Sequence, residues 1–135
     1  MSKECVNVNL KDITRAFIIV EIKSETYPDL NTLITFSREL SNLLNSTLLN
    51  SCYTEFPSNL DGVKNYTLLS VLSTSHIAIS TYFSRDEKYI DIEVSWCSKT
   101  SLKEEELRSL VRKCFGDCRI SVKVLDFLGN VIKQF

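Results

Sequence analysis

The chain has 135 residues, of which 44% are hydrophobic and 24% charged, and its formal net charge is −1. These values are typical of a globular protein, and we expect a single domain over residues 1–135. The balance of 16 basic and 17 acidic residues argues against a nucleic-acid-binding protein, because such proteins usually carry a basic excess. Only three glycines are present, which argues against a glycine-rich phosphate-binding loop.

The sequence also bears on location and metal binding. No segment is long and apolar enough to cross a bilayer, and the N-terminal residues lack the apolar stretch of a secretory signal. We therefore expect a cytoplasmic protein without membrane contact, whose five cysteines are thiols. Cys114 and Cys118 have no second ligand pair nearby, and His76 is the one histidine, so we expect no metal site.

The first half of the chain predicts a strand, a helix and a second strand. Residues 15–23 are rich in β-branched and aromatic side chains, which favours a buried strand. A helix is expected over residues 29–46 because apolar residues recur there at three- and four-residue steps, namely Leu33, Phe36, Leu40 and Leu44. Residues 48–56 are expected to form the next strand.

Two strand segments, 65–74 and 76–83, are expected next, with a break near Ser75. Residues 89–97 then alternate between two faces. The apolar face holds Ile90, Ile92, Val94 and Trp96, and the polar face holds Asp91, Glu93, Ser95 and Cys97. The apolar face is therefore expected to lie in the core.

The last helix is predicted over Ser101 to Gly116, with Ser101 and Glu104 forming a capping box. Its expected buried stripe consists of Leu107, Leu110, Val111 and Cys114. A strand over residues 118–127 follows. This order predicts an α/β protein, a two-layer α-β sandwich with a mostly antiparallel sheet and two helices on one face. Apolar residues on the uncovered face would favour pairing of two copies.

Ser75 and His76 are the only adjacent serine and histidine in the chain, which raises the question of a nucleophile and its base. Neighbouring side chains of a strand point to opposite faces of the sheet. The alternation therefore predicts that the two side chains do not meet, and that His76 shares a face with Ser80.

The segment around Ser75 resembles the self-cleavage segment of the small prokaryotic S-adenosylmethionine decarboxylases. Ser75-His76-Ile77 matches the Ser-His-Ile core of that segment, and Ile79 and Thr81 match as well. Glu93-Val94-Ser95-Trp96-Cys97 is similar to the strand that carries the family's cysteine. The opening strand and a later loop also resemble the family through Phe17–Glu21, Glu55-Phe56-Pro57 and Gly62-Val63, and the element order matches over about residues 14–126.

The resemblance implies a pyruvoyl-dependent decarboxylase. Self-cleavage would take place between Thr74 and Ser75, by attack of the serine on the carbonyl of Thr74. Ser75 would become the pyruvoyl cofactor, a ketone that accepts electrons while the substrate loses CO₂. Cys97 matches the cysteine that returns a proton to the product. The implied substrate is a small molecule derived from an amino acid, S-adenosylmethionine in spermidine synthesis, although the same scaffold also serves arginine.

The sequence departs from the family pattern at several of these positions. Thr74 stands where the family usually has glutamate, Ser98 stands where it has glycine, and Ser80 replaces the histidine that assists self-cleavage. A serine hydroxyl is no general base near neutral pH. Two alternatives to an active enzyme therefore stay open, namely a non-processing homologue that regulates an active partner subunit, and a ligand-binding domain. The resemblance implies a homodimer, or a hetero-oligomer with an active homologue.

Overall fold

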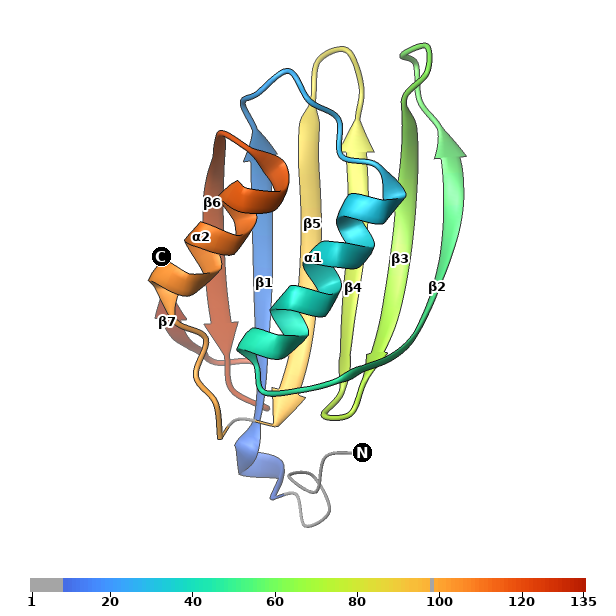
Figure 1. The fold of residues 1–135 in the computed structure, drawn as a ribbon. Coiled ribbons are helices and arrows are strands. Elements are labelled where there is room, and N and C mark those ends of the chain that lie inside the picture. The colour runs from blue at the N-terminus through green and yellow to red at the C-terminus, as the bar shows by residue number, and fades with distance from the viewer. Residues whose placement is uncertain (1–8, 98) are drawn as a thin grey trace.

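The computed structural model describes residues 9–97 and 99–135 and shows one antiparallel sheet with two helices on one face (Figure 1). The sheet order is β2-β3-β4-β5-β1-β6-β7. This arrangement confirms the predicted α-β sandwich. The elements in chain order are η1 (Leu10–Asp12), β1 (Ile13–Ile22), α1 (Leu30–Leu43), β2 (Leu48–Pro57), β3 (Lys64–Leu72), β4 (His76–Phe83), β5 (Lys88–Cys97), α2 (Glu104–Phe115), β6 (Cys118–Leu125) and β7 (Val131–Gln134).

The core lies between the sheet and the two helices. All four residues predicted for the inner face of β5 are buried, and so are those predicted for α1. Phe36 of α1 and Phe115 of α2 are fully buried and their ring centroids lie 5.0 Å apart, so the two helices pack against each other as well as against the sheet. The helices thus leave the opposite face of the sheet open.

Helix α1 is shorter than the sequence predicts. It begins after Asp29, whose carboxylate accepts a hydrogen bond from the backbone N–H of Thr32 at 2.9 Å. That bond lowers the pKa of Asp29. The helix ends at Leu43 and not near residue 46, because Asn45 takes a left-handed backbone conformation with φ 54°. Residues 45–47 are thereby freed to form the turn into β2.

Helix α2 begins three residues later than expected, and its predicted capping box is absent. The helix starts at Glu104, its N-cap residue is Lys103, and no side chain caps it. Leu102 is buried and Trp96 Nε1 donates to the carbonyl oxygen of Thr100 at 2.7 Å, contacts that fix the preceding segment outside the helix. Glu104 instead contacts Arg108 at 2.9 Å.

The buried stripe of α2 is close to the prediction. Leu107, Leu110 and Val111 are buried as expected, but Phe115 completes the stripe and Cys114 is only half-buried. The helix stops at Gly116, where φ is 77°, as the sequence predicts.

Strand β7 is absent from the prediction. A turn at its start holds it against β6, since Asp126 accepts hydrogen bonds from the backbone N–H groups of Leu128 at 3.0 Å and Asn130 at 2.9 Å. The bond from Asn130 is the main cause that lowers the pKa of Asp126. Within the described residues, no helix is both long and apolar enough to span a membrane.

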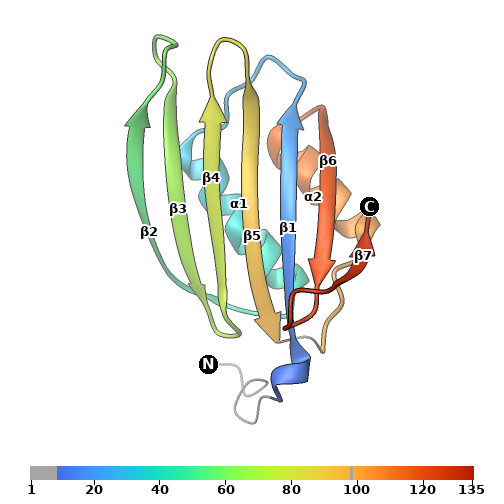
Figure 2. The same ribbon diagram turned by 180° about the vertical axis from the view of Figure 1, so that it is seen from behind.

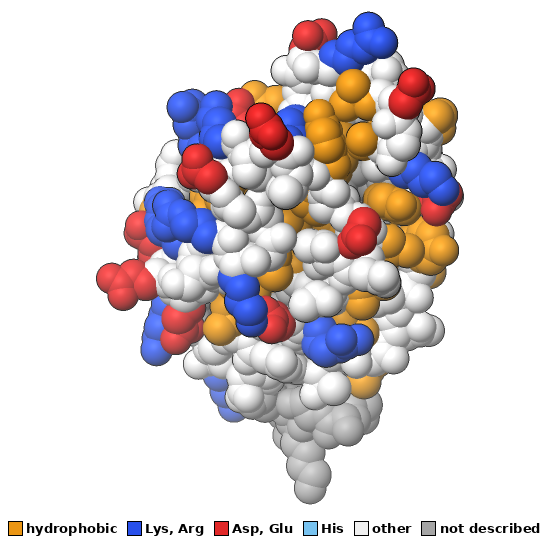
Figure 3. All heavy atoms as spheres, turned by 45° about the horizontal axis from the view of Figure 1, so that its top comes forward, with side chains coloured by type: hydrophobic (Ala, Val, Ile, Leu, Met, Phe, Trp, Pro, Cys, Tyr) orange, Lys and Arg blue, Asp and Glu red, His pale blue; other side chains and the backbone are white. Residues whose placement is uncertain are grey.

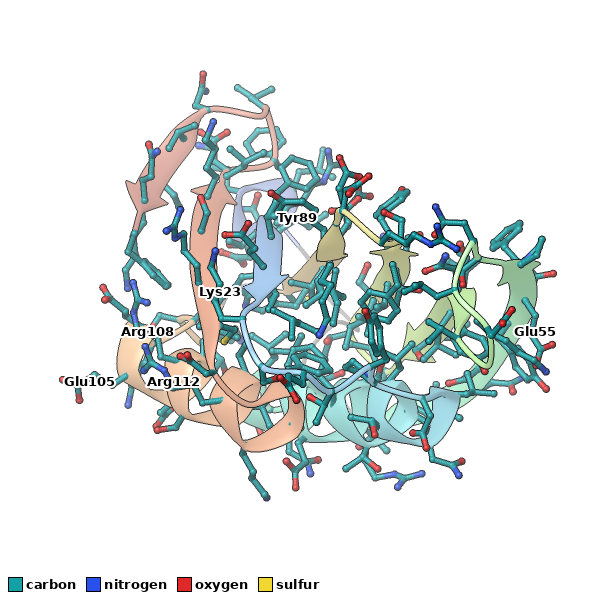
Figure 4. All side chains as sticks on the ribbon, turned by 90° about the horizontal axis from the view of Figure 1, so that it is seen from above. Lys23, Glu55, Tyr89, Glu105, Arg108 and Arg112 are labelled. Carbon is teal, nitrogen blue, oxygen red and sulfur yellow. The ribbon has the colours of Figure 1, made fainter. Side chains whose placement is uncertain are left out.

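The uncovered face of the sheet faces the viewer in Figure 2. Exposed apolar side chains on it include Phe17, Ile19, Leu69 and Val71. At one end of this face, Glu21 accepts a hydrogen bond from Tyr89 at 3.0 Å and pairs with Lys23 at 2.9 Å. Figure 4 labels Tyr89 and Lys23. Figure 3 tilts this end toward the viewer and shows acidic and basic side chains interspersed.

Candidate active site

The opposite end of the open face contains the bend between β3 and β4. Strand β3 ends at Leu72 and β4 begins at His76, so residues 73–75 make the connection. The backbone N–H of Leu72 donates to the carbonyl oxygen of Ser75 at 2.8 Å, which closes the bend. Ser75 therefore lies in the bend and not in a strand.

The segment before β2 holds this bend in place. Ser46 Oγ accepts hydrogen bonds from Thr74 Oγ1 at 2.7 Å and from the backbone N–H of Thr74 at 3.2 Å. Ser73 Oγ accepts from the backbone N–H of Thr47 at 3.0 Å. Thr74 is buried, with 5% of its surface exposed. Thr74, the residue before the predicted cleavage bond, is thus held by partners in the segment that precedes β2.

Ser75 Oγ lies 3.1 Å from Nδ1 of His76. The expectation that these two side chains do not meet is wrong. Strand alternation sends neighbours to opposite faces only when both residues are in the strand, and Ser75 precedes β4. His76 itself follows the alternation and is exposed on the open face. A hydroxyl and an imidazole are therefore in hydrogen-bond contact at the predicted cleavage position.

Strand β5 brings Cys97 to the same bend. His76 is paired with Ser95 in the antiparallel register of β4 and β5, so Cys97 lies beside the residues that precede His76. Its Sγ is 3.5 Å from the carbonyl oxygen of Thr74. Cys97 is disulfide-bonded, whereas Cys52, Cys114 and Cys118 are thiols. The expectation that all five cysteines are thiols is therefore wrong at Cys97.

A cavity of about 560 Å³ opens at this bend. Arg15 and Phe17 of β1 line it, and so do their partners in the strand pairing, Ser95 and Glu93 of β5. The cavity is lined by Ile13, Arg15, Phe17, Thr74, Ser75, His76, Glu93, Val94, Ser95, Trp96 and Cys97. It has room for a small organic molecule next to Ser75.

Ser80 lies away from this cavity. It shares the open face with His76, as the alternation predicts, but it is four residues further along β4, or about 13 Å at the rise of a strand. Its hydroxyl contacts Thr67 Oγ1 at 3.1 Å, and it lines a separate hollow of about 330 Å³. The structure therefore brings Thr74, Ser75 and Cys97 together and leaves Ser80 apart.

Asp91 is the direct neighbour of Ser80 on β5. Burial raises the pKa of its carboxyl group. Neither Asp91 nor Ser80 lines the cavity at the bend. Ser98, the third position where the sequence departs from the family pattern, lies outside the described residues.

Sequence reasoning missed two contributors to the site. Ser46 holds Thr74, and Arg15 lines the cavity. Only their position in the fold shows this, because Ser46 is 28 residues from Thr74 in the chain. Arg15 sits in the expected first strand, where its side chain on the open face could have been assigned from the alternation with Ala16 and Ile18.

The fold and the bend together define a class, a two-layer α-β sandwich with a serine in the β3–β4 connection and a cysteine beside it. The chain belongs to the S-adenosylmethionine decarboxylase family, whose model matches residues 18–126. The match includes the bend and Cys97 and confirms the resemblance. Members of this family are in general pyruvoyl-dependent. A search of curated proteins finds no match.

Proposed function

We propose that this chain is a pyruvoyl-dependent decarboxylase of S-adenosylmethionine that forms its own cofactor by cleavage between Thr74 and Ser75. The observation that supports the proposal most directly is the placement of that bond. Its carbonyl oxygen lies 3.5 Å from Cys97 Sγ, and the serine that follows it lines the cavity.

Cleavage starts when Ser75 Oγ forms a bond to the carbonyl carbon of Thr74 and the C–N bond breaks. The nitrogen takes a proton, and an ester joins the two parts of the chain. Loss of the Cα proton of Ser75 then expels the carboxylate of Thr74 and leaves a dehydroalanine. Water replaces its nitrogen, ammonia leaves, and a ketone remains at position 75.

The residues present fit such a group. Ser75 is in contact with the cavity, and the buried, doubly hydrogen-bonded Thr74 keeps the bend fixed after the chain is cut. A pyruvoyl group at this position supplies the electron sink for loss of CO₂. Glu93 places a carboxylate in the cavity, where it attracts a cationic substrate such as S-adenosylmethionine. Arg15 can pair with the carboxylate of an amino-acid-derived substrate.

In this proposal Cys97 returns a proton to the product carbon, and the support is that Cys97 and Ser75 line the same cavity. A disulfide-bonded sulfur carries no proton. The proposed decarboxylase is therefore active only after Cys97 has been reduced.

The test is mass spectrometry of the denatured protein after incubation with a thiol reductant. The proposal predicts two pieces in place of the 15.5 kDa chain, of about 8.5 and about 7 kDa, in proportion to 74 and 61 of its 135 residues. The second piece is lighter by one ammonia than a fragment that begins with serine. The reduced protein releases CO₂ from carboxyl-labelled S-adenosylmethionine, whereas the Ser75→Ala variant stays intact and inactive.

The outcomes separate the alternatives. A single full-length mass after long incubation with reductant overturns the cleavage, and co-purification with an active homologue would then establish a non-processing partner subunit. Cleavage with CO₂ released from arginine, and not from S-adenosylmethionine, retains the pyruvoyl enzyme and changes its substrate.

A further inference from the structure

We infer that His76 is the base that activates Ser75 for cleavage of the chain. The inference rests on the proposed self-cleavage and names the residue that carries its first step. It follows from the 3.1 Å distance between Ser75 Oγ and His76 Nδ1.

The contact is short enough for a proton to pass from the serine to the imidazole. At 3.1 Å the serine hydroxyl can donate to Nδ1 when the imidazole is neutral and carries its own proton on Nε2. Ser75 Oγ loses its proton to Nδ1 as it bonds to the carbonyl carbon of Thr74. The proton then passes from His76 to the nitrogen that leaves, so that the ester forms with no net change in charge.

The other groups at the bend are poorer candidates for this role. Arg15 is always protonated, and Ser80 lies in a different hollow. Glu93 and Cys97 also face the cavity, but the hydrogen bond of Ser75 runs to the imidazole. Cys97 Sγ lies 3.5 Å from the carbonyl oxygen of Thr74, where negative charge develops.

The bend orients the serine and the imidazole toward each other. Because Ser75 lies outside β4 and His76 opens it, the two neighbouring side chains can turn toward each other. Ser46 holds Thr74, the residue whose carbonyl carbon the serine attacks, through its side chain and backbone N–H. Serine, base and carbonyl are therefore positioned by three separate anchors, namely β4, the bend and the segment before β2.

The experiment compares reduced His76→Ala, His76→Gln and Ser80→Ala variants with the unchanged chain, by following intact mass over time. We expect the cleavage rate of both His76 variants to fall by at least about 100-fold, the usual contribution of a general base. We expect Ser80→Ala to cleave at the original rate. Added imidazole should restore part of the rate to His76→Ala and none to Ser75→Ala. The pH dependence of the cleavage rate should differ between the unchanged chain and His76→Ala.

Hydroxylamine identifies the step, because it cuts an ester and leaves a hydroxamate on Thr74. We expect this product from the unchanged chain and not from His76→Ala. His76→Ala that cleaves at the original rate overturns the inference and leaves the proposed function intact. His76→Ala that forms the ester and then stops also overturns it, since the histidine would then act in the elimination. An unchanged chain that never cleaves overturns the proposed function itself.

Discussion

Replacing Ser46 with alanine should both destabilise the protein and slow its cleavage. The variant loses the hydrogen bonds that Ser46 Oγ accepts from Thr74 at 2.7 Å and 3.2 Å. At about 1 kcal/mol for each buried hydrogen bond, the free energy of unfolding should fall by about 2 kcal/mol. That loss corresponds to roughly 6 °C in Tm for a chain of this size. The unfolding measurement uses urea and a Ser75→Ala background, so that only uncut protein is compared.

Ser51→Ala is the matched control. Ser51 lies in β2, away from the bend, and its Oγ is 2.9 Å from Oγ of Ser70. The alanine variant loses this one hydroxyl contact. It should cost about 1 kcal/mol and leave the cleavage rate unchanged. Ser46→Ala should slow cleavage by at least about tenfold, because the Thr74 peptide is no longer held in its reactive orientation. Equal stability losses in the two variants, or cleavage of Ser46→Ala at the original rate, would refute the anchoring role of Ser46.

Three further outcomes test the packing and electrostatics. Asp91→Asn should raise Tm at pH 7 by up to a few degrees, because burial makes the ionised carboxylate unfavourable in the fold. The gain in Tm should vanish as the pH falls toward 3.8, the usual pKa of the group. A gain that persists at that pH would contradict this explanation. Gly116→Ala should cost more in urea unfolding than Gly62→Ala, by about 1 kcal/mol or more. Both glycines have positive φ, but a Cβ added at Gly116 would lie 3.2 Å from Ser24 Oγ, whereas a Cβ added at Gly62 meets nothing within 4 Å. Equal costs would show that the crowding is relieved. Phe36→Ala should lower the free energy of unfolding by about 3–5 kcal/mol, and a loss below 1 kcal/mol would mean that the cavity between the helices collapses.

Periodicity was sufficient to predict the two layers, because the buried faces of α1 and β5 follow helix and strand spacing without interruption. It failed where a local contact outweighed propensity. The capping box at Ser101 is replaced by the burial of Leu102, and β7 depends on the turn that Asp126 and Gly129 build.

The site illustrates the same limit. The positions of Ser75 and Cys97 along the chain were sufficient to identify them as candidates, and the register of β4 and β5 places them at one bend. The contact between Ser75 and His76 depends on a strand that begins one residue later than the serine. The expected strand also begins at residue 76, so the boundary was predicted correctly, and the error was to extend the strand alternation to Ser75, which precedes the strand.

The sheet order has a consequence for a chain cut at the bend. The first piece would carry β1, α1, β2 and β3, and the second would carry the remaining strands and α2. Strand β1 of the first piece pairs with β5 and β6 of the second, and β3 pairs with β4, so the two pieces share one hydrogen-bonded sheet. A severed molecule would therefore keep its native size and dissociate only on unfolding, and the two halves, if synthesised separately, would have to fold around each other.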